Sequence, residues 1–212
     1  DGKSLDENAT VNELNRIDRV NHIIQNINLF GTDDGVKRGL VFCSRQEECI
    51  FLSHEFNVRG LRTIALTGSS SEDERSRAID LLETDDLEIK LDYIFTVDIF
   101  NEGVDIPEID TVLFLRPTES LTVFLQQLGR GLRLSEGKDC LTVLDFVGNS
   151  RPEYDFESKF RALIGKTTTS VQKEIEDDFP HLPLGCSIVL EKKTKETILE
   201  NIKKATSLNV NQ

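Results

Sequence analysis

The chain lacks several features that would place it in common classes of protein. Its 212 residues contain no Met and no Trp, and no apolar run approaches the roughly 20 residues of a membrane-spanning helix. The amino-terminal stretch DGKSLDENAT is not a signal peptide. We therefore expect no membrane partner and a cytoplasmic location. Because the chain begins with Asp rather than Met, we also expect it to be a fragment of a longer protein.

Metal-ligating residues are few and poorly spaced for a metal site. The four cysteines have no CxxC spacing, and the three histidines are scattered along the chain. This pattern argues against a zinc site and indicates reduced thiols, so we predict no metal bound by this chain. Cys43 and Cys49 are predicted to be small residues of the core.

A generally basic surface is also missing. The formal net charge is −13, and residues 1–150 hold 15 Lys and Arg against 28 Asp and Glu, whereas residues 151–212 hold ten of each. A surface that coats nucleic acid is excluded, and any contact with phosphate must be local.

Short apolar runs alternate with amphipathic segments over the first two thirds of the chain. This alternation predicts an α/β fold with a parallel sheet, right-handed crossovers and helices on both faces. Ser71 and Glu74 fit a capping box at the start of one helix. The predicted strands are residues 39–43, 61–67, 93–98, 111–116 and 140–148, and the predicted helices are residues 14–30, 46–56, 69–83 and a segment within 123–137.

The character of the sequence changes after Gly148. Residues 150–166 look helical, residues 178–191 read as a Pro-interrupted loop that enters a short strand, and residues 192–205 form a charged helix. This segment has too few apolar residues to fold alone, so we predict a strap that leads to a further domain. The predicted domains are 1–35, a helical lead-in; 36–150, the sheet domain; and 151–212, a mostly helical extension.

Small hydroxyl residues, a glycine and two arginines follow the predicted strands, and the second arginine is Arg116 at the end of the fourth strand. Function in an open parallel sheet gathers at the carboxyl ends of the strands. Ser44 and Arg45 follow the first strand, Thr67 and Gly68 follow the second, and Thr96 lies at the end of the third. These residues are natural phosphate contacts. The alternative interpretation is that the hydroxyls cap the helices that follow.

Two further segments suggest contact with a nucleotide. In NEGVDIPEID, residues 101–110, Gly103 permits close approach of the backbone and Asp105 could accept a ribose hydroxyl, although the same composition is common in turns. In VFLQQLGRGLRLSEG, residues 123–137, helical periodicity places Gln126, Arg130 and Arg133 on one face.

The two glycines of residues 123–137 favour an anion-binding role for that segment. Gly129 and Gly131 flank the polar face, and each costs a helix roughly 1 kcal/mol relative to Ala. A bare face with two guanidinium groups suits a large anion. Arginines near a helix end also satisfy the helix dipole, but that alternative leaves the glycines unexplained.

Four stretches together resemble the second RecA-like lobe, the helicase C-terminal domain, of a superfamily 2 helicase or translocase. QQLGRGLR is similar to motif VI of that family, FTVDIFNEGVDIP to motif V, GLVFCSRQEEC to motif IV and LTGSSSEDER to the Thr-Gly element, in the family's order over residues 38–148. The pair Gln126-Gln127 resembles the restriction-enzyme and repair-helicase group more closely than the DEAD-box proteins, which usually carry His-Arg there.

The resemblance implies a RecA-like fold and a role for each matching residue. Arg133 would be the arginine finger that reaches the γ-phosphate of ATP, Arg130 a second contact to that phosphate or to the other lobe, and Gln126 would help to position it. Such an arginine is worth about 10³–10⁵ in rate. The implied ATP-binding residues are Gly103, Asp105 and Gly129, and the implied nucleic-acid-binding residues are Ser44, Arg45, Thr67, Gly68 and Thr96.

The phosphate-binding loop and the acidic pair that hold ATP and Mg²⁺ belong to the family's first lobe. DGKS at residues 1–4 looks like the end of such a loop, but no strand precedes it. We therefore expect half of an ATP-dependent motor, inactive without lobe 1, with nucleic acid, DNA rather than RNA, and further domains of the same polypeptide as partners.

Two other classes of protein are alternatives to a helicase lobe. A degenerate lobe kept for protein contacts would be expected to lose Arg133 first. A dinucleotide-binding oxidoreductase would need a Gly-x-Gly-x-x-Gly turn after the first strand, where this chain has CSRQEE.

Overall fold

The computed structural model describes residues 2–31, 35–97, 99, 108–116, 140–146, 155–182 and 186–209. These residues belong to two compact units, the first containing a sheet and the second built of helices. Each unit is described by itself. Among the described residues, no helix is both long enough and apolar enough to cross a membrane.

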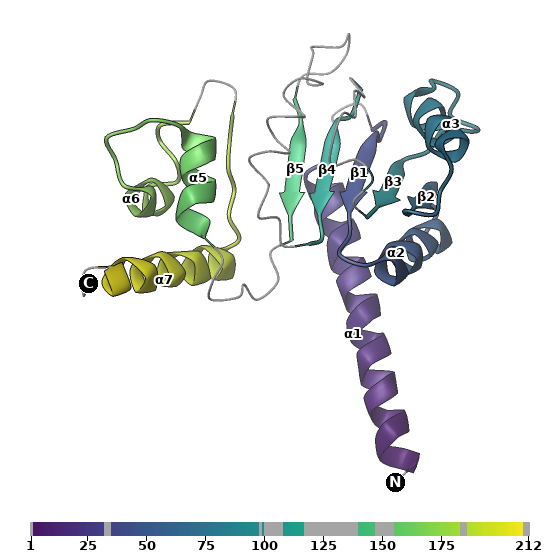
Figure 1. Ribbon diagram of the computed structural model, residues 1–212, viewed down its shortest axis with the longest axis horizontal. Coiled ribbons are helices and arrows are strands. Elements are labelled where there is room, and N and C mark those ends of the chain that lie inside the picture. The colour runs from purple at the N-terminus through teal and green to yellow at the C-terminus, as the bar shows by residue number, and fades with distance from the viewer. Residues whose placement is uncertain are drawn as a thin grey trace. The chain divides into compact units, whose positions relative to one another are not determined.

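The first unit contains a five-stranded parallel sheet, as the alternating pattern predicts. Its strand order is β2-β3-β1-β4-β5, and every neighbouring pair is parallel (Figure 1). The inner strands are buried along their whole length, which explains their continuous apolar sequence. The strands are β1 (Gly39–Phe42), β2 (Thr63–Leu66), β3 (Tyr93–Thr96), β4 (Thr111–Phe114) and β5 (Thr142–Asp145).

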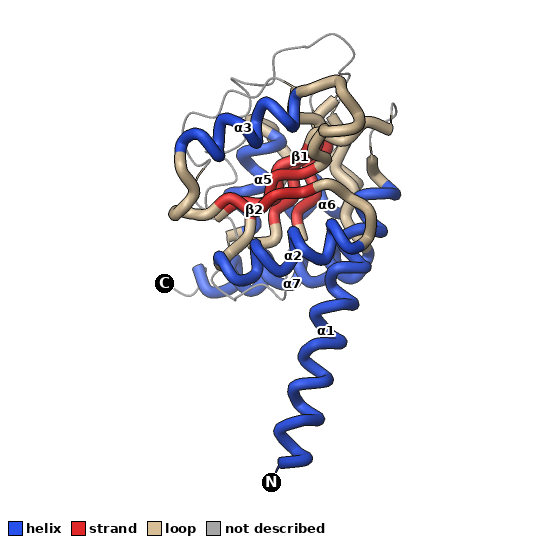
Figure 2. Tube along the Cα trace, turned by 90° about the vertical axis from the view of Figure 1, so that its right-hand side faces the viewer, coloured by secondary structure: helices blue, strands red, loops and turns tan. Residues whose placement is uncertain are grey.

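Three helices accompany this sheet: α1 (Gly2–Leu29), α2 (Gln46–Val58) and α3 (Glu72–Glu83). In Figure 2, α3 lies on one side of the strands and α2 on the other. The predicted capping box at α3 is confirmed, because the Glu74 N–H donates to Ser71 Oγ at 3.2 Å and the Ser71 N–H donates to Glu74 Oε2 at 2.7 Å. The first half of α1 projects past the ends toward which the strands run (Figures 1 and 2).

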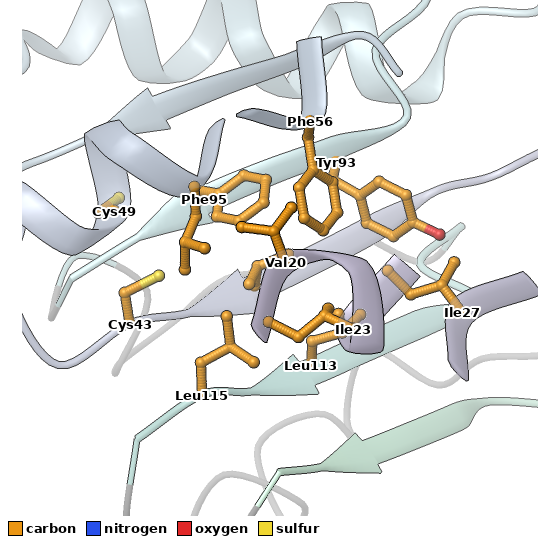
Figure 3. Packing of buried hydrophobic residues seen from close by; sticks show 12 residues of the cluster. Val20, Ile23, Ile27, Cys43, Cys49, Phe56, Tyr93, Phe95, Leu113 and Leu115 are labelled. Carbon is orange, nitrogen blue, oxygen red and sulfur yellow. The ribbon is translucent and has the colours of Figure 1, made fainter. Parts of the chain in front are cut away.

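One hydrophobic core cluster of the first unit lies between the sheet and the helices α1 and α2 (Figure 3). The ring of Phe56 in α2 meets Phe95 edge-on, with ring centroids 4.9 Å apart. Cys43 and Cys49 are fully buried in the same cluster, which confirms their prediction as core residues. The second half of α1 contributes Val20, Ile23 and Ile27.

The second unit contains α5 (Phe156–Ile164), α6 (Val171–Glu176) and α7 (Lys192–Asn209). Helix α6 was not among the elements predicted from the sequence. The short strand predicted within 178–191 is wrong for the described residues of that range, which form no strand. The described residues of this segment have a hydrophobic cluster of their own, and the strap toward a further domain stays a prediction. The buried members are Phe156, Phe160, Ile164, Val171, Ile175, Phe179, Ile198 and Ile202.

Candidate nucleic-acid interface

The structure describes five of the residues that the sequence assigned to a site, all in the first unit. Ser44, Arg45, Thr67, Gly68 and Thr96 lie at the carboxyl ends of β1, β2 and β3. The residues assigned to ATP and catalysis lie outside the described residues. These are Gly103, Asp105, Gln126, Gly129, Arg130 and Arg133.

Parallel register brings the strand ends into one row. Thr96, the last residue of β3, pairs with Leu66 of β2 on one side and Phe42 of β1 on the other. The Cys43 N–H then donates to the Thr96 carbonyl at 2.9 Å, which carries the pairing one residue beyond β1. The turns after β1 and β2 therefore start at the same level, with β3 between them. We call residues 43–45, 67–70 and 96 the strand-end row.

The turn after β1 presents Ser44 and Arg45 to solvent. Arg45 is the residue that precedes α2, with extended backbone (φ −137°, ψ 149°), and its side chain makes no capping bond. The Ser44 N–H donates to Glu48 Oε2 at 3.3 Å. Since the capping position belongs to Arg45, helix capping does not explain the hydroxyl of Ser44.

The turn after β2 is rich in hydroxyl groups. The Thr67 N–H donates to Ser70 Oγ at 3.1 Å, and the hydroxyls of Thr67 and Ser69 lie 2.8 Å apart. Ser71, not Thr67, caps α3, so the capping alternative fails here as well. Gly68 leaves open space, because a Cβ placed on it would meet only the Gln46 amide nitrogen, 4.0 Å away.

Thr96 is the hydroxyl residue of the row whose side chain is fully buried. Its hydroxyl has no hydrogen-bond partner among the described residues. A buried hydroxyl without a partner costs roughly 1–3 kcal/mol relative to an apolar group, so its presence at a strand end needs an explanation.

Arg19 belongs to this region although no sequence pattern predicted a role for it. Arg19, in α1, lies with Nη1 2.7 Å from Glu48 Oε1, and its Nη2 donates to the carbonyl of Leu115, just beyond β4, at 3.1 Å. Arg19 thus links α1 to the first turn of α2 and to the end of β4. No local pattern reveals these contacts, because the partners lie 29 and 96 residues away in the sequence.

The exposed side chains of the row include hydroxyl groups and the Arg45 guanidinium. A hydrogen bond with Cys49 and burial raise the pKa of the Cys43 thiol far above its ordinary value, which makes Cys43 a poor nucleophile. No group of three or more His, Cys, Asp or Glu side chains that could hold a metal ion occurs in the part of the chain that the structure describes. Exposed hydroxyls and the Arg45 side chain remain, and these groups suit phosphate.

Comparison with known proteins finds a protein family whose model matches this chain. The model of the "Helicase conserved C-terminal domain" matches residues 17–135, more than half of the chain. The chain is 30% identical over 143 residues to "Putative ATP-dependent helicase IRC3" of Saccharomyces cerevisiae, covering 67% of this chain and 20% of that protein. It is 38% identical over 113 residues to "Putative mitochondrial ATP-dependent helicase irc3" of Schizosaccharomyces pombe, covering 53% and 18%. The chain therefore spans about a fifth of the length of these relatives.

A solved structure supports the fold. The C-terminal domain of the DEAD-box protein Dbp5 is similar, with a TM-score of 0.51 and 16% identity over 86% of this chain and 89% of that one. At this identity the likeness concerns the fold alone, and it confirms the RecA-like architecture predicted from the sequence.

Proposed function

Since this chain belongs to the family of helicase conserved C-terminal domains, we propose that it is the second motor lobe of an ATP-dependent nucleic-acid helicase or translocase. The strand-end row carries this proposal: a lobe of this family places exposed Ser44, Arg45 and the Thr67 turn at one level of a parallel sheet. We propose that this row contacts the phosphates of a nucleic-acid strand through Ser44, Arg45, Thr67, Gly68 and Thr96.

The net charge of the chain supports nucleic-acid binding through a few local contacts. The net charge of −13 repels a polyanion at long range, so affinity must come from a few short contacts with phosphate. Hydroxyl and backbone N–H groups supply such contacts without added charge, and they select position rather than base sequence. This chemistry is the same for both nucleic acids. The resemblance of QQLGRGLR to the restriction-enzyme and repair-helicase group favours DNA in the proposal.

The ATP side of the proposal rests on the resemblance of residues 101–110 and 123–137 to the family motifs. We assign Arg133 to the γ-phosphate as the arginine finger, Arg130 to a second contact with the phosphate or the other lobe, and Gln126 to positioning it. Gly103, Asp105 and Gly129 would lie against the nucleotide. Phosphoryl transfer is catalysed mainly by positioning and charge neutralisation, which is what two guanidinium groups supply.

ATP and Mg²⁺ would be held mainly by lobe 1 of the parent polypeptide. Mg²⁺ in such sites is bound by carboxylates and phosphate oxygens, and we assign those carboxylates to lobe 1. By this proposal the chain alone hydrolyses essentially no ATP, and closure of the two lobes completes the site.

The test is ATP turnover by the full-length parent protein, with and without single- and double-stranded DNA and RNA. Stimulation by one polymer is expected, and Arg133→Ala should reduce the stimulated rate by about 10³-fold or more. Arg59→Ala is the matched control, because Arg59 forms an ion pair with Glu55 at the other end of α2. If no polymer stimulates turnover by wild-type protein, the motor proposal is wrong, and a non-catalytic interaction lobe becomes the better account.

A further inference from the structure

The carboxylate of Glu48 lies where the proposed interface least tolerates negative charge. Its Oε2 accepts the Ser44 N–H at 3.3 Å, so the charge sits directly behind a turn assigned to phosphate contact. The Glu48 side chain is about one fifth exposed, with 21% of its surface accessible. Water therefore screens this charge only in part.

Arg19 compensates this charge from a different element. Its Nη1 lies 2.7 Å from Glu48 Oε1, so the two carboxylate oxygens have separate partners. Its Nη2 also donates to the Leu115 carbonyl at 3.1 Å. The planar guanidinium spans both acceptors, and a Lys ammonium group, a compact point charge, does not match this fork.

The same contacts fix the position of the turn. Helix α1 is anchored in the core by Val20, the residue next to Arg19. Through Arg19 this anchored helix holds Glu48, and through Glu48 it holds the backbone N–H of Ser44.

We propose that Arg19 is a positioning residue for nucleic-acid binding, which holds Glu48 against the turn after β1 and cancels its charge next to the bound strand. This inference rests on the proposed function, because it presumes that the strand-end row binds phosphate. Arg19 itself does not contact the strand in this account. Its removal leaves an uncompensated carboxylate beside the phosphates, which repels them.

The experiment measures binding of fluorescein-labelled oligo(dT) and oligo(U) by the full-length parent protein, using fluorescence anisotropy. Arg19→Ala should weaken binding of the preferred polymer by about 3- to 10-fold. Glu48→Gln in the same background removes the offending charge and should restore the affinity to within about twofold of wild type. In ATPase assays, Arg19→Ala should raise the polymer concentration for half-maximal stimulation much more than it lowers kcat. A general loss of folding would not produce either pattern.

Two variants complete the design. Arg59→Ala removes an ion pair of similar geometry, with Arg59 Nη1 2.6 Å from Glu55 Oε2, and should bind polymer as wild type does. Arg19→Lys keeps a positive charge near Glu48 and replaces Arg19→Ala in the experiment if Arg19→Ala lowers the melting temperature. The polymer affinity of Arg19→Lys should fall less than about threefold.

The outcomes separate the two proposals. If wild-type protein binds neither polymer, the proposed function fails and this inference fails with it. If wild-type protein binds but Arg19→Ala binds equally well, only the role of Arg19 is overturned. The role of Arg19 is also overturned if the variant that combines Arg19→Ala with Glu48→Gln binds no better than Arg19→Ala alone. Compensation of the Glu48 charge would then play no part in binding.

Discussion

The Nδ1 atom of His181 lies 2.7 Å from Oε1 of Glu174 in the second unit, and the Glu174 side chain is fully buried while that of His181 is 54% exposed. Burial raises the pKa of Glu174, but hydrogen bonds with His181 and Thr169 outweigh it and leave the pKa below the ordinary value of 4.5. The folded unit therefore prefers the ionised carboxylate.

This preference predicts that acid destabilises the second unit through Glu174. A carboxyl group whose pKa is lowered by folding contributes stability above its unfolded pKa and loses that contribution as the pH falls through the folded value. Amide hydrogen exchange of residues 171–182, measured in the whole chain, should accelerate as the pH drops below about 4.5, after correction for intrinsic rates. Glu174→Gln should exchange faster at pH 7 and depend less on pH; an unchanged profile would count against the pair.

Gly39→Ala is predicted to destabilise the first unit by about 1–3 kcal/mol through overpacking. A Cβ on Gly39 would run into the ring of Tyr93, which is buried and held edge-on against Phe56 with ring centroids 6.2 Å apart. Urea unfolding measures the loss. Combining Gly39→Ala with Tyr93→Leu should cost less than the sum of the two changes. Gly68→Ala is the control, because its Cβ would meet only the Gln46 amide nitrogen at 4.0 Å, so this variant should leave stability unchanged.

The four cysteines are predicted to fall into two classes of reactivity. Cys43 and Cys49 are buried, and Cys140 and Cys186 are exposed. Since the thiolate is the reactive form, the raised pKa of Cys43 and its burial should slow alkylation by about 100-fold or more. Iodoacetamide at pH 8 with peptide mass spectrometry should label Cys140 and Cys186 first and all four only in denaturant. Early labelling of Cys43 in folded protein would contradict the core placement.

The sheet could be predicted because its signals are local. Each buried strand is a short apolar run, and parallel strands joined by helices leave their carboxyl ends at one edge. The capping box of Ser71 and Glu74 spans three residues and is equally visible. The row of Ser44, Thr67 and Thr96 followed from the same rule, and the register confirms that these strand ends lie together.

The remaining features depend on contacts that the sequence does not display. The guanidinium of Arg19 joins Glu48 and Leu115 only once α1, α2 and β4 have packed. The burial of Thr96 likewise depends on which elements cover the sheet. From the sequence alone, a hydroxyl at a strand end is equally compatible with an exposed position. The hydrophobic cluster of the second unit could have been predicted from the sequence, because Phe156, Phe160 and Ile164 recur at four-residue steps in α5.

Thr96→Val is predicted to separate stability from function. Valine keeps the β-branched shape, so the strand should tolerate it, and it removes a buried hydroxyl that has no partner among the described residues. The free energy of unfolding should therefore stay equal or rise by up to about 2 kcal/mol. A polar group kept at such a cost is typical of a functional site, so polymer binding should weaken in the same variant.

Urea unfolding of the chain and anisotropy with oligo(dT) and oligo(U) on the full-length parent give the two readouts for Thr96→Val, and Thr63→Val is the control. The hydroxyl of Thr63 is also buried but is bonded, with Ser53 Oγ at 2.8 Å and the Ser53 carbonyl at 2.9 Å. That variant should lose about 1–3 kcal/mol of stability because it leaves Ser53 without its partner. A similar loss in Thr96→Val would mean that the Thr96 hydroxyl is bonded within the lobe. Unchanged polymer binding would remove Thr96 from the proposed contacts while leaving Ser44 and Thr67 in place.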